Sequence, residues 1–154
     1  NRKIVGFDTF EGFSSVSDKD GPLAIVDDFA TTPQYDQYLE QVLNYHEQEN
    51  PISHIKKYEL IRGDATVELE KYLKENPETI IALAYFDLDL YEPTKICLEL
   101  IQDYLTKGSI IGFDELNHHH YPGETLALKE IMGLQKYSIS RSIYSRINSF
   151  ITIE

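Results

Sequence analysis

The sequence has 154 residues, of which 42% are hydrophobic and 26% charged, values typical of one folded domain and not of a disordered or fibrous chain. Its 26 acidic and 14 basic residues give a net charge of −12, which disfavours binding to nucleic acid or to an anionic membrane and favours a divalent cation or an uncharged or cationic substrate. The single cysteine allows no internal disulfide. Because we identify no signal peptide and no apolar segment long enough to span a bilayer, we expect a cytoplasmic protein.

Short apolar segments alternate along the chain with longer segments of helical period. Residues 80–86 form the longest apolar run, which predicts a central strand buried on both faces. Between residues 33 and 48 the apolar positions recur with the spacing of an amphipathic helix, for which Thr32 is the expected N-cap and Pro33 the first residue. Gly108 is expected to follow the end of a later helix. In chain order we expect a strand over 4–7, a loop over 9–21, a helix over 33–48, a strand over 58–62, a helix over 66–76, a strand over 80–86, a helix over 93–105, a strand over 110–113, a helix over 122–132 and strands over 137–141 and 149–153.

This order of elements predicts one α/β domain over residues 1–154. Strands that alternate with helices form right-handed crossovers, so we expect a mostly parallel sheet with helices on both faces. The last two strands are joined by a short connection and are expected to form an antiparallel pair.

Carboxylates follow each of the expected parallel strands, at the edge where ligands bind in open α/β sheets. If the strands over 80–86 and 110–113 are neighbours, the acids that follow them in the sequence lie close together. Their negative charges then repel one another unless a cation lies between them. Oxygen ligands of this kind suit Mg²⁺, Ca²⁺ or Mn²⁺. The alternative for a single acid at a strand end is to cap the next helix, and Asp64 fits that role well. The acids in question are Asp8, Asp64, Asp87, Asp89, Asp114 and Glu115.

Three consecutive histidines, His118, His119 and His120, follow the last of these acids. Neighbouring side chains are expected to diverge, so the three imidazoles form either a solvated loop or a loop with one ring lining the site. Their spacing does not fit a zinc site. Tyr91 is expected near a ligand, whereas Cys97 falls on a buried helix face and is expected to be inert.

Several segments, in this order along the chain, resemble the macrocin O-methyltransferase (TylF-like) family of class I S-adenosylmethionine-dependent methyltransferases. They are FDTFEGF at 7–13, RGD at 62–64, FDLDLYEPT at 86–94, GFDELN at 112–117 and PGET at 122–125. The resemblance implies a Rossmann-like class I methyltransferase sheet and a Mg²⁺-assisted transfer of a methyl group from S-adenosylmethionine to a hydroxyl of a sugar or a sugar-bearing natural product. It is compatible with a homo-oligomer.

The resemblance also implies a role for each matching residue. Asp89 is the expected general base. Apart from the resemblance, the place of the histidines in the loop after Glu115 makes His119, or its neighbour His118 or His120, a candidate assistant in catalysis. The expected cofactor-binding residues are Asp8 with Phe10 on the ribose side, Asp64 with Ala65 at the adenine, and Asp87; the expected metal ligands are Asp87, Asp114 and Glu115.

The sequence departs from the family pattern at three places. Leu88 stands where the family usually has glycine, and Glu115 stands where it usually has a second aspartate. The glycine-rich first strand and turn are absent, so we expect a fragment that lacks the first strand and the N-terminal helices of the fold. Two alternatives follow: a non-catalytic or degenerate domain that binds a cation or nucleoside, and an aspartate-based phosphohydrolase built on Asp87 and Asp89.

Overall fold

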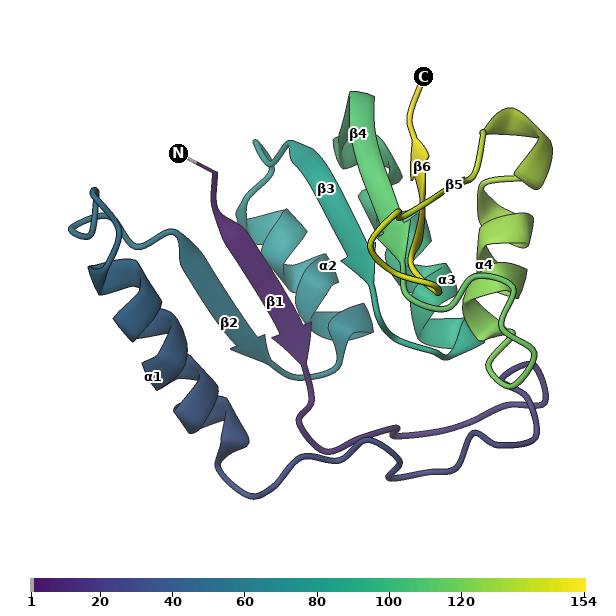
Figure 1. Cartoon of the computed structure of the whole chain (residues 1–154), viewed down its shortest axis with the longest axis horizontal. Helices are drawn as coiled ribbons and strands as arrows, with labels where there is room; N and C mark the ends of the chain where they lie inside the picture. Colours follow the sequence, from purple (N-terminus) through teal and green to yellow (C-terminus); the bar gives the residue numbers. More distant parts are fainter. Residues whose placement is uncertain (1) are drawn as a thin grey trace.

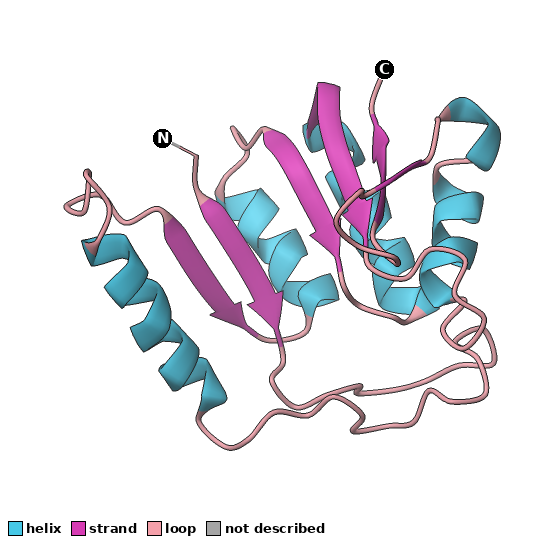
Figure 2. Cartoon of the chain, viewed as in Figure 1, coloured by secondary structure: helices cyan, strands magenta, loops and turns pink. Residues whose placement is uncertain are grey.

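The computed structural model describes residues 2–154, which form the alternating strands and helices drawn in Figures 1 and 2. The elements are β1 (Ile4–Asp8), α1 (Tyr35–Gln48), β2 (Tyr58–Arg62), α2 (Ala65–Glu75), β3 (Ile81–Phe86), α3 (Tyr91–Ile101), a 3₁₀ turn (Gln102–Tyr104), β4 (Leu105–Phe113), α4 (Gly123–Ile131), a second 3₁₀ turn (Leu134–Lys136), β5 (Ser140–Arg141) and β6 (Ser149–Thr152). The predicted order of elements is confirmed.

The differences from the predicted elements lie at their ends. The residue at the N-cap of α1 is Gln34, with φ of 66° and no side-chain cap, so the N-cap predicted at Thr32 and the helix start predicted at Pro33 are wrong. The helix expected over 93–105 ends at Ile101, and Leu105 already belongs to β4, where it pairs with Ile81. Gly108, with φ of 87°, lies within this strand and does not end a helix.

Within residues 2–154 the strands form two sheets, and no hydrogen bond between strands joins them. β1 pairs with β2 in parallel, and the second sheet has the order β3-β4-β6-β5, with β3 parallel to β4 and β6 antiparallel to both of its neighbours. The predicted antiparallel pair at the end of the chain is therefore confirmed. In Figure 1, β1 and β3 are the edges through which the two sheets face each other, and α2 lies behind them.

The hydrophobic core lies between the second sheet and helices α3 and α4. Its centre consists of the fully buried side chains of Leu98 on α3, Leu128 on α4, Ile111 and Phe113 on β4, and Ile151 on β6. Because β6 is antiparallel to β4 and carries Ile151 into this layer, the end of the chain completes the core.

The opposite face of β3 is not covered by the described residues. Leu83 is 62% exposed and Tyr85 54%, so the prediction of a strand buried on both faces is wrong. Leu83 and Tyr85 alternate along β3 with side chains that face the core. The helices that pack on β3 lie on the core side. Within residues 2–154, no helix has the length and apolar character that crossing a membrane requires.

Candidate active site

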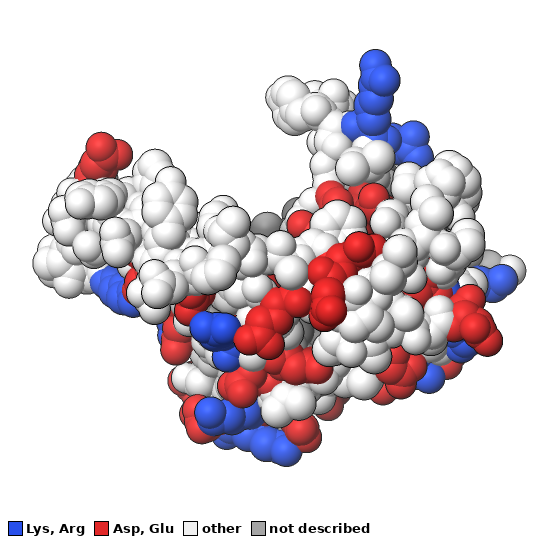
Figure 3. Space-filling view, turned by 90° about the horizontal axis from the view of Figure 1, so that it is seen from below, with Lys and Arg blue, Asp and Glu red and all other residues white. Residues whose placement is uncertain are grey.

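The strands β1 to β4 all end on one side of the molecule, which Figure 3 views directly. Acidic side chains gather in the middle of this face. The predicted convergence of strand-end carboxylates follows from the parallel register, in which Phe86 pairs with Phe113 and the acids of both strands come next. We call residues 87–90 the β3 loop and residues 114–122 the β4 loop.

The β3 loop holds Asp89 in an unusual backbone conformation. Its φ is 58°, in the left-handed region that non-glycine residues seldom occupy, and the Leu90 N–H donates to the Leu88 carbonyl across it at 2.5 Å. Burial raises the pKa of Asp89 to about 7, and the negative charges of Glu115 and Asp87 add to this effect. Asp89 is therefore a carboxyl that can exchange a proton near neutral pH.

The Leu88 side chain points toward the hydrophobic core and not toward the acids at the strand ends. Its side chain is partly buried and packs against the hydrophobic core. The departure from glycine at this position thus adds a core contact, while Asp87 on one side of it stays exposed and Asp89 stays half-buried.

Asp114, the first acid of the β4 loop, is held by two side chains that the sequence did not single out. Its Oδ1 accepts hydrogen bonds from the Tyr85 hydroxyl at 2.9 Å and from Nδ2 of Asn148 at 2.6 Å. Burial and the bond to Asp114 raise the pKa of the Tyr85 phenol, which stays a donor at neutral pH. No motif marks Tyr85 or Asn148, because Tyr85 reads as a strand residue and Asn148 lies in a distant loop.

Glu115 lies beside His118 rather than His119. Its Oε2 is 3.6 Å from Nδ1 of His118, and burial, followed by the charge of Asp114, raises the pKa of Glu115. The His118 ring stacks on Tyr121 at a centroid distance of 5.9 Å. His119 is exposed. If one of the three histidines lines the site, the structure favours His118.

The three imidazole rings pack together, so the prediction that they diverge is wrong. Their centroids lie 5.4 Å apart for His118 and His119, 5.6 Å for His118 and His120, and 3.6 Å for His119 and His120. Asn117, with φ of 64°, turns the chain just before them. Such a turn removes the regular alternation of side chains on which the prediction relied.

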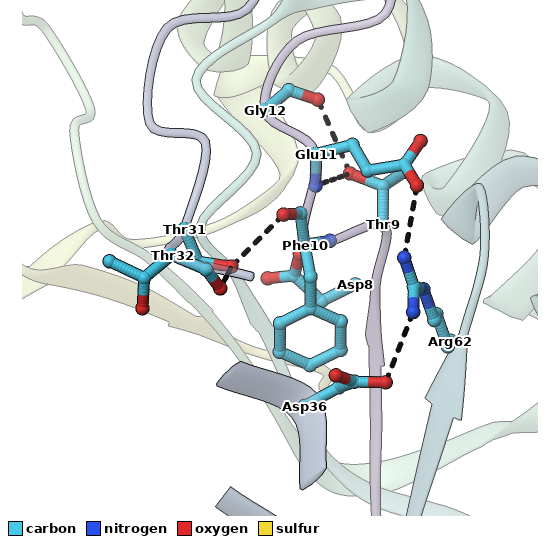
Figure 4. A network of polar contacts seen from close by, with 9 residues as sticks. All are labelled: Asp8, Thr9, Phe10, Glu11, Gly12, Thr31, Thr32, Asp36 and Arg62. Atoms are coloured by element: carbon cyan, nitrogen blue, oxygen red, sulfur yellow. Dashed lines mark hydrogen bonds and ion pairs between the residues drawn. The ribbon is translucent and has the colours of Figure 1, made fainter. Parts of the chain in front are cut away.

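The end of β1 forms the second part of the site, drawn in Figure 4. Oδ1 of Asp8 accepts a hydrogen bond from the Phe10 N–H at 2.6 Å, and the Phe10 carbonyl accepts one from the Thr31 hydroxyl at 3.0 Å. Arg62, at the end of β2, bridges Glu11 at 3.0 Å and Asp36 at 3.2 Å. These contacts fix the turn after β1 while the Asp8 side chain remains exposed.

A pocket of about 340 Å³ opens beside this turn. It is lined by Phe10, Glu11, Arg62 and residues 30–36. Of the predicted cofactor residues only Phe10 lines it, and the acids of the β3 and β4 loops do not.

Asp64 caps α2. Its Oδ1 accepts from the Thr66 backbone N–H at 2.8 Å and from the Thr66 hydroxyl at 2.7 Å. The capping interpretation is therefore confirmed. The contact of Asp64 and Ala65 with an adenine stays a prediction, and it is compatible with the cap.

Two further predictions concern residues of α3. The predicted burial of Cys97 is confirmed, and this burial raises the pKa of the thiol to about 12. Tyr91 was expected near a ligand, and this is wrong. Its buried ring lies under Nζ of Lys19, 3.7 Å from the ring centroid, and its hydroxyl donates to Glu130 on α4.

The acids of the β3 and β4 loops have the chemistry of a hard-cation site but are not arranged as one. Within residues 2–154, no group of three or more histidine, cysteine or acidic side chains is placed to hold a metal ion. One reason is that Oδ1 of Asp114 is already bonded to Tyr85 and Asn148. Burial raises the pKa of Asp87, and the negative charges of Asp114 and Asp8 raise it further. A bound cation would relieve this repulsion between the carboxylates.

The strand order and the acids at the strand ends agree with the predicted class I methyltransferase fold. No protein-family model and no curated protein matches the chain. Among solved structures it is similar to CalS11, a calicheamicin methyltransferase, with 45% identity over 98% of this chain and 60% of that one, and a TM-score of 0.92.

Two further structures agree. The apo form of CalS11, described as a TDP-rhamnose 3'-O-methyltransferase of calicheamicin biosynthesis, gives 39% identity over 98% of this chain and 58% of that one, with a TM-score of 0.81. The O-methyltransferase NovP, at 16% identity over 99% of this chain and 60% of its own, has a TM-score of 0.60 and supports the fold alone.

The resemblance to TylF-like methyltransferases and the predicted fold are confirmed by these comparisons. The chain spans about three fifths of the CalS11 structures that it matches. The facing edges of β1 and β3, which no described strand pairs, agree with the prediction that the first strand of this fold is lacking from the chain.

Proposed function

We propose that this chain is the larger part of an S-adenosylmethionine-dependent O-methyltransferase that acts on a hydroxyl of a sugar or a sugar-bearing natural product. The observation that carries the proposal is the 45% identity to CalS11 over nearly the whole chain, in a structure that brings Asp87, Asp89, Asp114 and Glu115 to adjacent strand ends. By similarity to the apo CalS11 structure, a nucleotide-linked deoxysugar such as TDP-rhamnose is the first acceptor to test.

In the proposed reaction Asp89 is the general base. It accepts the proton of the acceptor hydroxyl while the hydroxyl oxygen bonds to the methyl carbon and the carbon–sulfur bond of the methyl donor breaks, which leaves S-adenosylhomocysteine. Its pKa of about 7 matches a base that must be ionised before the reaction and protonated after it. His118, beside Glu115, and His119, the sequence prediction, are the two histidines to test as assistants.

The cofactor is proposed to lie between the ends of β1 and β3. Asp8 would accept hydrogen bonds from its ribose hydroxyls, next to the turn that Phe10 fixes, and Asp64 and Ala65 would contact the adenine. Asp87, on the second sheet, is proposed as a further contact of the cofactor. The negative charge of Asp8 contributes to its raised pKa, which supports a position for Asp87 near the end of β1.

The predicted divalent cation would be held by Asp87, Asp114 and Glu115, which would have to move from their present arrangement to ligate it together. When bound, it would lower the pKa of the reacting hydroxyl. The mutual repulsion of these carboxylates supports such a cation, and the oxygen-only donor set would favour Mg²⁺.

The test is methyl transfer by the full-length protein from labelled S-adenosylmethionine to TDP-rhamnose, with Mg²⁺ and with EDTA. We expect transfer that Asp89→Asn lowers by about 10²–10⁴-fold while S-adenosylhomocysteine still binds. Asp103→Asn, an exposed acid on the 3₁₀ turn after α3, is the matched control.

Other outcomes separate the alternatives. Binding of S-adenosylhomocysteine without transfer to any sugar acceptor would favour a non-catalytic nucleoside-binding domain. Release of phosphate from an aryl phosphate would favour the phosphohydrolase. Equal transfer in Mg²⁺ and EDTA would remove the cation from the proposal and leave the rest standing.

A further inference from the structure

The first turn of α4 contacts both acidic loops through three consecutive residues, Gly123, Glu124 and Thr125. We propose that this turn is a clamp that fixes the β3 loop against the β4 loop, and that Glu124 is its positioning residue. The inference rests on the proposed function, because it assigns to Glu124 the spacing between the general base and the acids of the neighbouring strand.

Glu124 is a buried carboxylate whose two oxygens bond to two different loops. Its side chain has no exposed surface, Oε1 accepts from the Leu88 N–H at 3.2 Å, and Oε2 accepts from the Glu115 N–H at 3.3 Å. Leu88 lies between the two aspartates of the β3 loop, and Glu115 is itself one of the β4-loop acids. One side chain therefore joins the backbones that carry the acids of both strands.

The neighbours of Glu124 extend this contact. A Cβ on Gly123 would lie 2.6 Å from the carbonyl oxygen of Asp89 and 2.5 Å from the nitrogen of Tyr91, so only glycine lets the helix approach the β3 loop this closely. Oγ1 of Thr125 accepts from the Asn117 N–H at 2.7 Å, in the β4 loop. All three residues of the turn thus engage backbone groups of one loop or the other.

Packing alone does not account for a glutamate at this position. Among the described residues no cation pairs with Glu124, and a buried carboxylate without one is costly to the fold. An apolar side chain of similar size would fill the space but would leave the N–H groups of Leu88 and Glu115 without acceptors. A carboxyl group places one oxygen in front of each N–H, which a neutral amide with its single oxygen does not.

The distinguishing variant is Glu124→Gln, with Glu130→Gln as its control. Glu130 is on the same helix and also accepts hydrogen bonds, from Tyr91 and Lys95, but it does not touch either acidic loop. In Glu124→Gln the amide NH₂ faces one of the two backbone N–H groups, so that loop is released while the other is retained.

Two readouts are needed, and both use the full-length protein. The first is amide hydrogen exchange in peptides covering residues 86–90 and 113–117, which we expect to speed up by about tenfold or more in Glu124→Gln and not in Glu130→Gln. The second is turnover, where we expect kcat to fall by about 10- to 100-fold while the Kd for S-adenosylhomocysteine stays within about twofold. A purely structural role would instead lower the melting temperature with kcat unchanged below it.

The result that overturns the clamp is exchange and kcat equal to those of the wild type in folded Glu124→Gln. If that variant does not fold, Thr125→Val and Thr125→Ser decide the matter, because only serine keeps the hydroxyl that accepts from Asn117. Faster exchange and lower kcat in the valine variant alone support the clamp, and identical behaviour of the two variants overturns it.

The clamp and the proposed function fail in different ways. If the wild type transfers no methyl group, the proposed function is wrong, and the exchange measurement still tests whether Glu124 joins the loops. If the wild type is active and Glu124→Gln matches it, the clamp alone is wrong.

Discussion

Oδ1 of Asp20, in the long loop after β1, accepts a hydrogen bond from the Tyr91 N–H at the start of α3, at 2.5 Å. Oδ2 of the same carboxylate accepts from the backbone N–H and the hydroxyl of Ser17. Asp20 is 2% exposed, and the adjacent Gly21 approaches the carbonyl of His120 so closely that a Cβ there would lie 2.2 Å from it. A single buried carboxylate thus ties the loop of the first sheet to the acidic end of the second.

This tie predicts that Asp20→Ala destabilises the chain. The substitution leaves the Tyr91 and Ser17 N–H groups without acceptors, so the free energy of unfolding should fall by about 1–3 kcal/mol. Urea unfolding followed by circular dichroism measures it, with Asp18→Ala, an exposed acid of the same loop, as the control. Equal losses in the two variants would show that the loop is not held at Asp20.

The buried carboxyl of Glu124 predicts a pH dependence of stability in metal-free buffer. Burial raises its pKa to about 8, from an ordinary value of 4.5, although the N–H groups of Leu88 and Glu115 oppose the shift. At pH values between these two pKa values the folded state binds more protons than the unfolded state. The stabilising contribution of Glu124 is therefore lost as the pH rises. Wild-type protein should therefore lose stability from about pH 5 to 8 in EDTA.

Comparison of variants isolates this effect. Glu124→Gln should show a shallower decline over that window, because Asp89, with its own raised pKa, still contributes. Glu130→Gln should run parallel to the wild type, since hydrogen bonds from Lys95 and Tyr91 lower the pKa of Glu130 and its contribution changes only at more acidic pH. A Glu124→Gln curve parallel to the wild type would contradict the prediction.

The cap and the proposed adenine contact of Asp64 can be separated by two substitutions. Asp64→Ala removes both, and should cost about 1 kcal/mol of stability together with affinity for S-adenosylhomocysteine. Asp64→Ser retains a hydroxyl that caps α2, so the stability should be largely restored while the affinity remains low. Calorimetric titration of both variants measures the affinity; full affinity in Asp64→Ser would leave Asp64 as a cap alone.

The thiol of Cys97 should be unreactive in the folded chain. Burial raises its pKa to about 12, and the thiolate is the reactive form. We expect no reaction with a thiol-specific disulfide reagent at pH 8 until denaturant is added, and then one equivalent. Rapid labelling of the native protein would mean that α3 opens readily from the core.

The sequence was sufficient to predict the order of the elements and the position of the acids, because both depend on local patterns. Apolar periodicity identifies a strand such as β3, and a carboxylate that follows each parallel strand must come to the same edge of the sheet. The charge of Glu115 raises the pKa of Asp89, in agreement with that rule.

What the sequence did not predict depends on tertiary contacts. Tyr85 and Asn148 hold Asp114 from a strand face and a distant loop, and no local spacing links them. The position of His118 beside Glu115 and stacked on Tyr121 likewise depends on the folded loop and not on any local spacing. Glu124 was given no role of its own from the sequence, since only the fold brings two other loops onto it.

The two sheets also divide the proposed cofactor site. Asp8 is on the first sheet and Asp87 on the second, and no strand hydrogen bond joins β1 to β3. A strand paired with both β1 and β3, the place of the predicted first strand of this fold, would fix one sheet relative to the other before a ligand that contacts both acids binds. Contacts that fix β1 relative to β3 preorganise the cofactor site. Ligand affinity and the cooperativity of unfolding should therefore rise together as these contacts become stronger.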